Sequence, residues 1–169
     1  MLLEVKNLKK YFPHATEDSK QGFVRAVDGI SFSLSKGETL GLVGESGCGK
    51  STAGRTVLRL LEPTAGEVIY KGRNILSLSQ QEIQPLRKEA QIIFQDPYAS
   101  LNPKRTVGNI LAEPFRIHNI TTETKERVIE LLQRVGLSPD NYDRYPHEFS
   151  GGQRQRIGIA RAIALSPEF

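Results

Sequence analysis

The chain has 169 residues, of which 38% are hydrophobic and 25% are charged, values that suit one globular domain and exclude a disordered chain. The formal net charge is +4, and the basic residues are spread along the chain without a block of five, so a nucleic-acid footprint is not indicated. The single cysteine excludes an intramolecular disulfide, and no stretch approaches the roughly 18 uninterrupted apolar residues of a membrane span.

The first third of the sequence alternates between patterns typical of strands and of turns. We predict strands over Leu2–Lys6 and over Ile30–Leu34, where apolar residues alternate with serines. The polar stretch His14–Gly22 between them is expected to form an exposed hairpin loop. A further short strand is expected over Glu67–Tyr70, followed by a turn at Lys71-Gly72. Charged residues among the first six leave no apolar run for a signal peptide, so export is not expected.

The most informative segment fits the phosphate-loop pattern Gly-x-x-x-x-Gly-Lys-Ser/Thr at every fixed position. Its glycines permit backbone angles at which successive amide groups turn toward a polyphosphate. Lys50 supplies a mobile positive charge for the β and γ phosphates, and Ser51 supplies a hydroxyl for Mg²⁺. The segment therefore predicts a nucleoside triphosphate site formed by Gly44, Glu45, Ser46, Gly47, Cys48, Gly49, Lys50, Ser51 and Thr52.

The setting of this loop strengthens the interpretation. The apolar run Glu38–Val43 before it predicts a strand, and Thr52–Leu61 after it has the apolar spacing of a helix. A glycine-rich turn with a chance Lys-Ser pair is the alternative, and the order of strand, loop and helix argues against it. Cys48 is interpreted as a small residue that contributes its amide, and a reactive thiol is the less favoured interpretation.

The second half of the sequence is dominated by helical patterns. Ser79 and Glu82 have the spacing of a capping box, so a helix is expected to begin there, and the β-prone run Ala90–Gln95 follows it as a strand. Asp96–Pro103 is expected to be a turn-rich loop, and Thr106–Val135 to form two helices. The second helix is expected to have an apolar face of Val128, Ile129, Leu131, Leu132 and Val135.

A second glycine motif lies at Ser150–Gln153, at the start of a helix predicted over Gln153–Leu165. A serine hydroxyl, two glycine amides and the positive end of a helix converge there, so the motif could hold a phosphate. Taken alone, the motif is interpreted equally well as a helix N-cap followed by flexible glycines.

The segment Phe149–Arg156 resembles the signature motif of ABC ATPases, with Phe149 where leucine is more usual. Phe94–Pro103 and Arg144–Phe149 resemble the ATP-binding subunits of oligopeptide and dipeptide importers. The resemblance covers nearly the whole chain. It implies an α/β P-loop NTPase core with an antiparallel β subdomain and an inserted α-helical subdomain, incomplete at the C-terminus. As one nucleotide-binding domain, the chain would comprise core 1–96, helical subdomain 97–148 and signature segment 149–169.

The resemblance also implies roles for individual residues, with ATP and Mg²⁺ as cofactors. Gln95 would sense Mg²⁺ and the attacking water, and Ser51 would be the other metal ligand. Phe12 would stack on adenine, with Tyr11 as the alternative and a purely structural role for both left open. The residues that would close over the γ-phosphate of a partner's nucleotide are Ser150, Gly151, Gly152 and Gln153, of which Ser150 and Gly152 are expected to act in catalysis together with Lys50 and Gln95.

The same resemblance implies partners and a location. Two ATP-binding subunits would sandwich two nucleotides head to tail at the cytoplasmic face of the membrane and drive a transmembrane permease. The peptide-importer branch usually pairs two different sister subunits, and two identical copies are the alternative. Members of the family carry an aspartate, a glutamate and a later histidine beyond the position of Ser166-Pro167. Because this sequence reaches only Phe169, we expect the 169 residues alone to hydrolyse ATP at or near background.

Two other functions remain open from the sequence. One is a nucleotide-binding module that does not hydrolyse ATP. The other is a chromosome-maintenance ATPase of the same superfamily, which would account for the basic charge. Those relatives insert a long coiled coil between the two glycine motifs, whereas Lys50 and Ser150 are only 100 residues apart and no heptad tract lies between them. The spacing therefore favours a transporter subunit.

Overall fold

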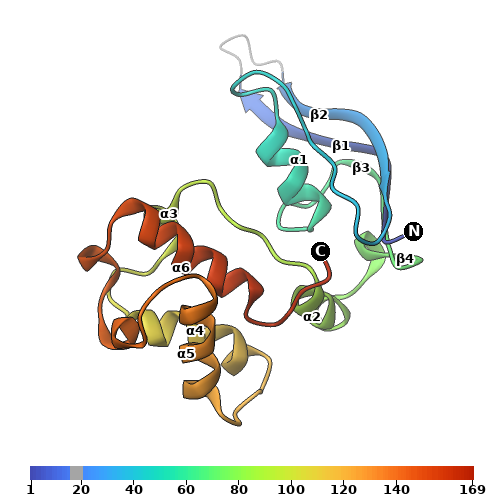
Figure 1. Ribbon diagram of the computed structural model, residues 1–169. Helices are drawn as coiled ribbons and strands as arrows, with labels where there is room; N and C mark the ends of the chain where they lie inside the picture. Colours follow the sequence, from blue (N-terminus) through green and yellow to red (C-terminus); the bar gives the residue numbers. More distant parts are fainter. Residues whose placement is uncertain (16–20) are drawn as a thin grey trace. The chain divides into compact units, whose positions relative to one another are not determined.

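The computed structural model describes residues 1–15 and 21–169, which fold into two compact units, Met1–Gln84 and Pro85–Phe169 (Figure 1). The first unit contains the sheet and the second is built from helices. The predicted combination of an antiparallel β part and a helical block is therefore confirmed. None of the helices in the described ranges is long and apolar enough to cross a membrane.

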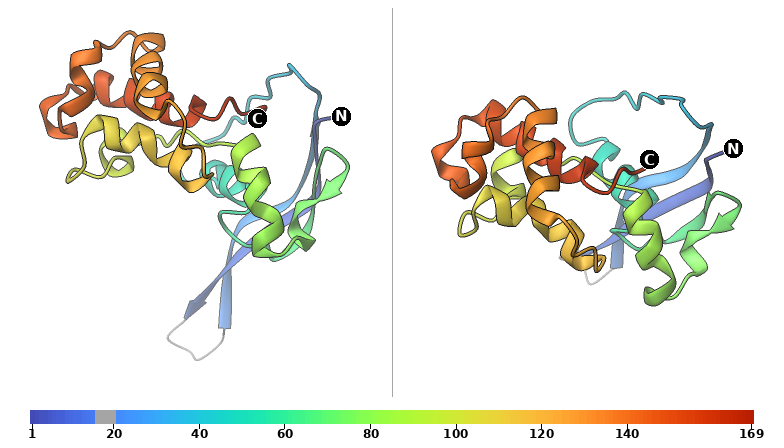
Figure 2. Two further views of the ribbon diagram at one scale, coloured as in Figure 1. Left: turned by 90° about the horizontal axis from the view of Figure 1, so that it is seen from below. Right: turned by 60° about the horizontal axis from the view of Figure 1, so that its bottom comes forward.

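The sheet of the first unit is antiparallel throughout and has the strand order β2-β1-β3-β4. Its longest element is a β1–β2 hairpin whose strands run side by side far beyond the predicted lengths (Figure 2). The predicted loop at His14–Gly22 is wrong at its ends, because His14 pairs with Gly22 in the ladder, and residues 16–20 lie outside the described residues. The strands are β1 Leu3–Ala15, β2 Gln21–Leu34, β3 Ala65–Tyr70 and β4 Arg73–Asn74.

The turn between β3 and β4 confirms the predicted strand and turn. Lys71 and Gly72 both have positive φ angles, 48° and 79°, and two such residues give a turn whose twist matches that of antiparallel strands. The alternation along β3 buries Val68 and Tyr70 on one face. This hairpin was predictable because both of its signals are local.

Helix α1 (Lys50–Val57) packs with β1 and β2 and is shorter than the predicted Thr52–Leu61. The chain leaves the helix through Arg59, which has a φ of 50°. The guanidinium of Arg59 donates to the carbonyls of Ile75 and Leu78 at 3.0 and 2.5 Å, next to the 3₁₀ helix η1 (Ile75–Ser77). These bonds stabilise a sharp end to the helix that its apolar spacing did not indicate.

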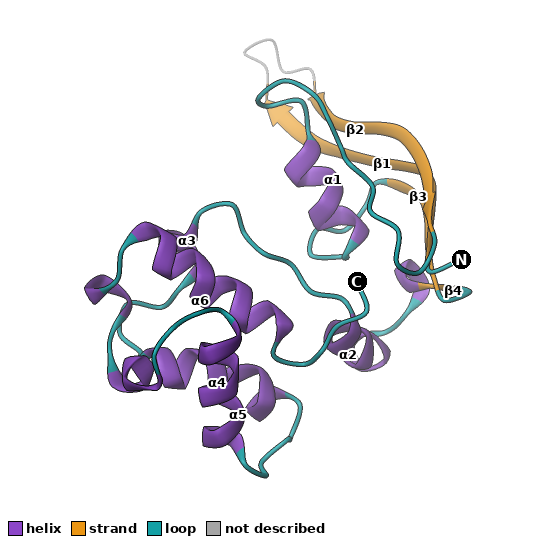
Figure 3. Ribbon diagram, viewed as in Figure 1, coloured by secondary structure: helices purple, strands orange, loops and turns teal. Residues whose placement is uncertain are grey.

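Two predicted strands are absent. Residues 39–43 lie outside the sheet, and they are drawn as part of the long loop that precedes α1 (Figure 3). Leu40, Leu42 and Val43 are exposed there, Val43 by 97%. A strand needs a hydrogen-bonding neighbour, and no backbone group in the described ranges pairs with 39–43. The prediction of a strand over Glu38–Val43 is therefore wrong for this structure.

The predicted strand Ala90–Gln95 is also not assigned to a sheet, but its first residues are paired. Phe169 donates its amide to Glu89 at 3.1 Å and accepts from the Gln91 amide at 2.9 Å. These two bonds flank Ala90 and have the pattern that parallel strands make, over a single residue. The segment is thus extended and bonded at one end, without a ladder along its length.

The helices of the second unit agree with most of the sequence-based expectations. The capping box at Ser79 is confirmed, because the Ser79 amide donates to Glu82 and the Glu82 amide donates to the Ser79 hydroxyl. The helices are α2 Gln80–Glu89, which begins in the first unit, α3 Pro97–Ser100, α4 Val107–Ile117, α5 Thr124–Arg134 and α6 Gly151–Ile163, with the 3₁₀ turns η2 Pro139–Asp143 and η3 Pro146–Glu148.

The core of the second unit lies between α4, α5 and α6 (Figure 1). The predicted apolar face of α5 is confirmed, with Val128 and Leu132 fully buried. Gly108 of α4 lies against the ring of Tyr142 so closely that a Cβ would be 2.5 Å from it. Phe149 and Ile157 join this core from the α6 side, so the residue immediately before the second glycine motif is anchored by burial.

Candidate nucleotide-binding site

The phosphate loop links residues 39–43 to α1, which begins at Lys50. Gly47 and Gly49 adopt φ angles of 82° and 96°, in the left-handed region that favours glycine. At Gly44 an added Cβ would lie 2.6 Å from the Cys48 sulfur, so the Cys48 side chain would have to move to make room for it. Gly47 and Gly49 thus use the backbone freedom that the sequence predicted, whereas Gly44, for which the same role was predicted, has no left-handed φ angle.

Lys50 is directed back into its own loop. Its ammonium donates to the carbonyls of Gly44 and Glu45 at 2.7 and 2.6 Å, and its Nζ lies 3.5 Å from the exposed Cys48 sulfur. The Cys48 amide donates to the Glu45 carbonyl at 3.3 Å. The loop is therefore closed around a positive charge that its own carbonyls hold, at the positive end of α1.

The chemistry of this loop fits a triphosphate with its metal ion. Residues 41–48 are exposed, and the cation at the loop is Lys50, which contacts the carbonyls of Gly44 and Glu45 and the sulfur of Cys48. Ser51 is exposed at the first turn of α1. Within the described ranges no three His, Cys, Asp or Glu side chains cluster to hold a metal. A Mg²⁺ ion here would take the Ser51 hydroxyl, phosphate oxygens and water as ligands, which is its usual manner of binding with nucleotides.

The two candidate adenine-stacking residues have different surroundings in β1. The Tyr11 hydroxyl donates to Asp28, a bond that raises the pKa of Tyr11 and lowers that of Asp28, and the Arg25 guanidinium lies 5.6 Å from the Tyr11 ring. Phe12 is half-buried, with the Lys10 ammonium 4.8 Å from its ring centroid. The hydroxyl of Tyr11 is thus already bonded to Asp28, whereas the Phe12 ring has, among the described residues, a cation–π contact with Lys10.

The second glycine motif forms the N-terminus of α6. Ser150 is the N-cap: its hydroxyl accepts from the Gln153 amide at 3.3 Å, and the Gln153 side chain accepts from the Ser150 amide at 2.9 Å. Gly151 is half-buried. Gly152 is exposed, and a Cβ added to it would have no atom within 4 Å. The N-cap interpretation and the anion-site interpretation are compatible, because a capping hydroxyl accepts one bond and can still donate its own proton.

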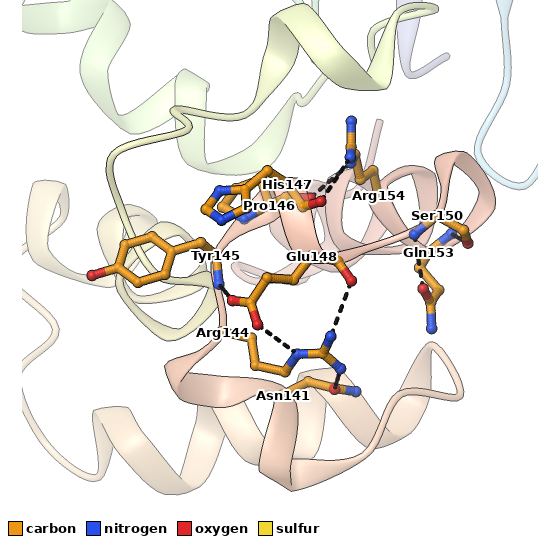
Figure 4. Close-up of polar contacts among 9 residues, drawn as sticks. All are labelled: Asn141, Arg144, Tyr145, Pro146, His147, Glu148, Ser150, Gln153 and Arg154. Carbon is orange, nitrogen blue, oxygen red and sulfur yellow. Dashed lines mark hydrogen bonds and ion pairs between the residues drawn. The ribbon is translucent and has the colours of Figure 1, made fainter.

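The turn before this motif is held by charged groups (Figure 4). Glu148 accepts from the Tyr145 amide at 2.6 Å and from Arg144 Nε at 3.3 Å. These contacts hold the pKa of the Glu148 carboxyl below its usual range. The hydrogen bond from the Tyr145 amide has the largest single effect, and the Arg144 guanidinium adds to it. The Arg144 guanidinium also lies 4.9 Å from the ring centroid of buried Phe149.

Gln95 is exposed and lies in a bend, and the strand end at which it was expected is not formed. The next residue, Asp96, caps α3 by accepting from the amides of Tyr98 and Ala99 at 2.8 and 3.3 Å. Tyr98 is 62% exposed, and its ring faces the Arg154 guanidinium at 3.9 Å. Gln95 is thus followed at once by a helical turn that contacts α6.

The predicted residues are divided between the two units. The phosphate loop and Phe12 belong to Met1–Gln84, and Gln95 and Ser150–Gln153 belong to Pro85–Phe169. Sequence reasoning missed the arginines around the second glycine motif, Arg144 and Arg154. Arg154 stands four residues after Ser150, one helical turn away, which was the only available signal that it returns to that motif.

Comparison with known proteins places these features in context. The profile described as ABC transporter matches residues 27–169. The oligopeptide transport ATP-binding protein AppF of Bacillus subtilis is 59% identical over 99% of this chain and 52% of its own length, and OppF of the same organism is 55% identical over 99% and 55%. The glutathione import ATP-binding protein GsiA of Salmonella typhimurium is 59% identical over 86% of this chain and 24% of its own length.

The chain spans about half the length of the Bacillus relatives. Among solved structures, the dimeric structure of MJ0796, a bacterial ABC transporter cassette, has a TM-score of 0.84 and 27% identity, covering 98% of this chain and 71% of that one. The post-hydrolysis dimer of the same cassette with ADP and Pi gives the same values.

Proposed function

This chain belongs to the ABC transporter family, and we propose that it is the ATP-binding portion of an importer for oligopeptides or a related small solute. The observation that carries the proposal is the glycine loop at the start of α1, with the Lys50 ammonium held at its carbonyls. The names of the relatives, which concern oligopeptide and glutathione transport, support the class of solute.

In the proposed complex, the phosphates of MgATP replace the loop carbonyls as partners of Lys50. Anions are stronger acceptors than neutral carbonyls, which favours this exchange, and amides of the glycine loop would turn toward the phosphates as further donors. Ser51 then supplies a hydroxyl to the metal, Phe12 provides an aromatic surface for adenine, and Gln95 approaches the metal and the water. We propose these three roles from the positions of Ser51, Phe12 and Gln95 in the chain.

We further propose that two such proteins associate head to tail around the nucleotides, with Ser150–Gln153 of one copy at the γ-phosphate held by the other. The dimeric state of the MJ0796 cassette supports this arrangement. Closure would depend on the γ-phosphate, because contacts to it exist only before hydrolysis, and hydrolysis would release the pair. A permease at the membrane would be the partner that receives this movement.

The first test is nucleotide binding, measured by titrating a fluorescent ATP analogue with Mg²⁺ and competing it with ATP. Wild type should bind saturably, and Lys50→Ala should weaken binding by about tenfold or more, the range for losing a charge-assisted hydrogen bond. Lys104→Ala, an exposed lysine in the second unit, is the matched charge control and should bind as wild type does. Absence of saturable binding at millimolar MgATP would overturn the proposal.

A second test separates the remaining functions. Phosphate release and uptake of a labelled oligopeptide are measured with the full-length transport protein and its permease. ATP-dependent uptake that is lost in Lys50→Ala supports the importer. Saturable binding without phosphate release favours a non-hydrolysing module, and tight, salt-dependent binding to duplex DNA favours a chromosome-maintenance ATPase.

A further inference from the structure

Arginine side chains bind the three successive carbonyl groups that precede Phe149 (Figure 4). Arg154 Nε donates to the Pro146 carbonyl at 2.7 Å, and its Nη2 lies 3.4 Å from the His147 carbonyl. Arg144 Nη2 donates to the Glu148 carbonyl at 3.0 Å. Every carbonyl of η3, the turn that ends at Glu148, is therefore bound by the charged, planar guanidinium of an arginine.

Arg154 also contacts the segment that follows Gln95. Its guanidinium lies 3.9 Å from the ring centroid of Tyr98 in α3, close enough for a stacking and cation–π contact. Two helical turns later, Arg161 donates to the carbonyl of Ser100, at the other end of α3. Helix α6 thus holds α3 at both ends through two arginines, and Arg154 is the one that also reaches the turn before Ser150.

We infer that Arg154 is a positioning residue that fixes the Ser150–Gln153 motif relative to the segment after Gln95, an inference that rests on the proposed function. Its contacts are directed at Pro146, His147 and Tyr98, so it acts on a phosphate only through the motif that it orients. Ser150 is then set from two sides, by its capping box with Gln153 and by the turn that Arg154 holds.

Arginine suits this position because one group performs two tasks. Its planar fork reaches two neighbouring carbonyls while its face stacks on an aromatic ring, whereas lysine has a single ammonium that cannot do both. A motif held in advance loses less conformational freedom when it closes on the γ-phosphate, so its orientation affects turnover more than ground-state binding. The inference therefore predicts a specific kinetic signature.

The experiment compares Arg154→Gln with Arg156→Gln in the full-length transport protein. Arg156 is the matched control: it lies on the same helix and also donates to two carbonyls, of Gly136 at 3.0 Å and Val135 at 3.5 Å, but these are at the end of α5. Arg154→Gln should lower kcat for ATP about tenfold and leave KM within about twofold, the size expected for losing a charged hydrogen bond in the closed state. Arg154→Lys should lose less, and Arg156→Gln should stay within twofold of wild type.

A second measurement reports how firmly the Ser150–Gln153 motif is held. Hydrogen exchange of the Ser150 and Gln153 amides should accelerate about tenfold in Arg154→Gln and remain unchanged in Arg156→Gln. A kcat within twofold of wild type together with unchanged exchange would overturn the inference, as would equal losses in the two variants. If wild type hydrolyses no ATP, the proposed function fails, and the exchange measurement still decides whether Arg154 positions the motif.

A pair of substitutions at Tyr98 keeps the inference testable if Arg154→Gln does not fold. Tyr98→Phe keeps the ring under the guanidinium and should behave as wild type in kcat and exchange. Tyr98→Leu removes the ring from an exposed site and should lower kcat by about threefold, the value of a typical cation–π contact. Equal kcat and equal exchange in these two variants would overturn the role given to the Tyr98 contact and with it the inference.

Discussion

Gly49 lies so close to Ala26 that a Cβ on Gly49 would be 1.9 Å from the Ala26 carbonyl oxygen. Ala26 belongs to β2, so the last glycine of the phosphate loop packs directly on the backbone of the long hairpin. The same glycine has a φ of 96° and immediately precedes the first residue of α1. The position of the helix N-terminus therefore depends on a contact that any side chain at residue 49 would break.

Gly49→Ala should lower the free energy of unfolding by about 2 kcal/mol or more, because it adds backbone strain to an overlap with a carbonyl that cannot move freely. It should also abolish saturable MgATP binding, since α1 is displaced from the loop. Gly54→Ala is the control within the same helix: no atom lies within 4 Å of its Cβ position, so alanine should be neutral or stabilise by about 0.5–1 kcal/mol. Equal stability of the two variants in urea titrations would contradict the contact with Ala26.

Gly108→Ala should destabilise the second unit by about 1–3 kcal/mol, the usual range for overpacking a core. The added Cβ would lie 2.5 Å from atoms of the Tyr142 ring, which must then shift. Gly158→Ala provides the matched comparison, because it is also a buried helical glycine but has no atom within 4 Å of its Cβ position. Thermal unfolding should show Gly108→Ala well below wild type and Gly158→Ala at or above it.

The elements that the sequence predicted correctly have signals contained within a few residues. The Ser79–Glu82 capping box, the apolar face of α5 and the Lys71-Gly72 turn each depend on neighbours along the chain. The strands at 38–43 and 90–95 were predicted from equally apolar runs, yet a strand is completed only by a neighbour far away in sequence. In the described chain, the second run is paired only at its first residues, where Phe169 bonds to Glu89 and Gln91.

The glycine motifs were predictable for the same reason, and their surroundings were not. Spacing alone specifies the loop at Gly44–Thr52 and the cap at Ser150. It does not indicate that Lys50 turns back to the loop carbonyls or that Arg154 spans from α6 to Tyr98. Long charged side chains choose partners by three-dimensional proximity, which a linear pattern does not contain.

Acid should loosen the turn before the second glycine motif. The pKa of the Glu148 carboxyl is held below its ordinary value of 4.5 by the Tyr145 amide and then by Arg144. When the pKa of a carboxyl is lower in the folded protein than in the unfolded chain, the carboxylate stabilises the fold. This stabilisation is fully present above the pKa of the unfolded chain and is lost as pH falls through the pKa of the folded protein. The contribution of Glu148 to stability should therefore be constant near pH 6–7 and decline from about pH 4.5 downward.

Glu148→Gln isolates this carboxylate. The difference in free energy of unfolding between wild type and Glu148→Gln should be largest at pH 6 and shrink as pH falls below about 4.5, because the glutamine does not titrate. Glu130→Gln, at an exposed position on α5, gives the baseline for replacing a carboxylate by a neutral side chain. A difference that stays constant between pH 6 and pH 3 would show that the Tyr145 and Arg144 contacts do not favour the charged form.

Ser150 has a measurable structural role that must be separated from its proposed role at the γ-phosphate. Ser150→Ala removes the hydroxyl that accepts from the Gln153 amide, and loss of an N-cap costs about 1 kcal/mol. Both the stability and the ATP-dependent association should fall, so this variant alone does not distinguish the two roles. Ser150→Asn and Ser150→Asp do, because both residues cap helices about as well as serine.

The two variants differ only in charge at the cap, which makes the comparison decisive. Both should unfold within about 0.5 kcal/mol of wild type, as expected when the cap is retained. Ser150→Asp places a carboxylate where the γ-phosphate of the partner's ATP is proposed to lie, and like charges at such distances in a closed interface cost several kcal/mol. ATP-dependent dimer formation, measured by light scattering, should therefore be lost in Ser150→Asp and largely kept in Ser150→Asn. If both form the dimer equally well, no phosphate approaches the N-terminus of α6, and Ser150 is a helix cap alone.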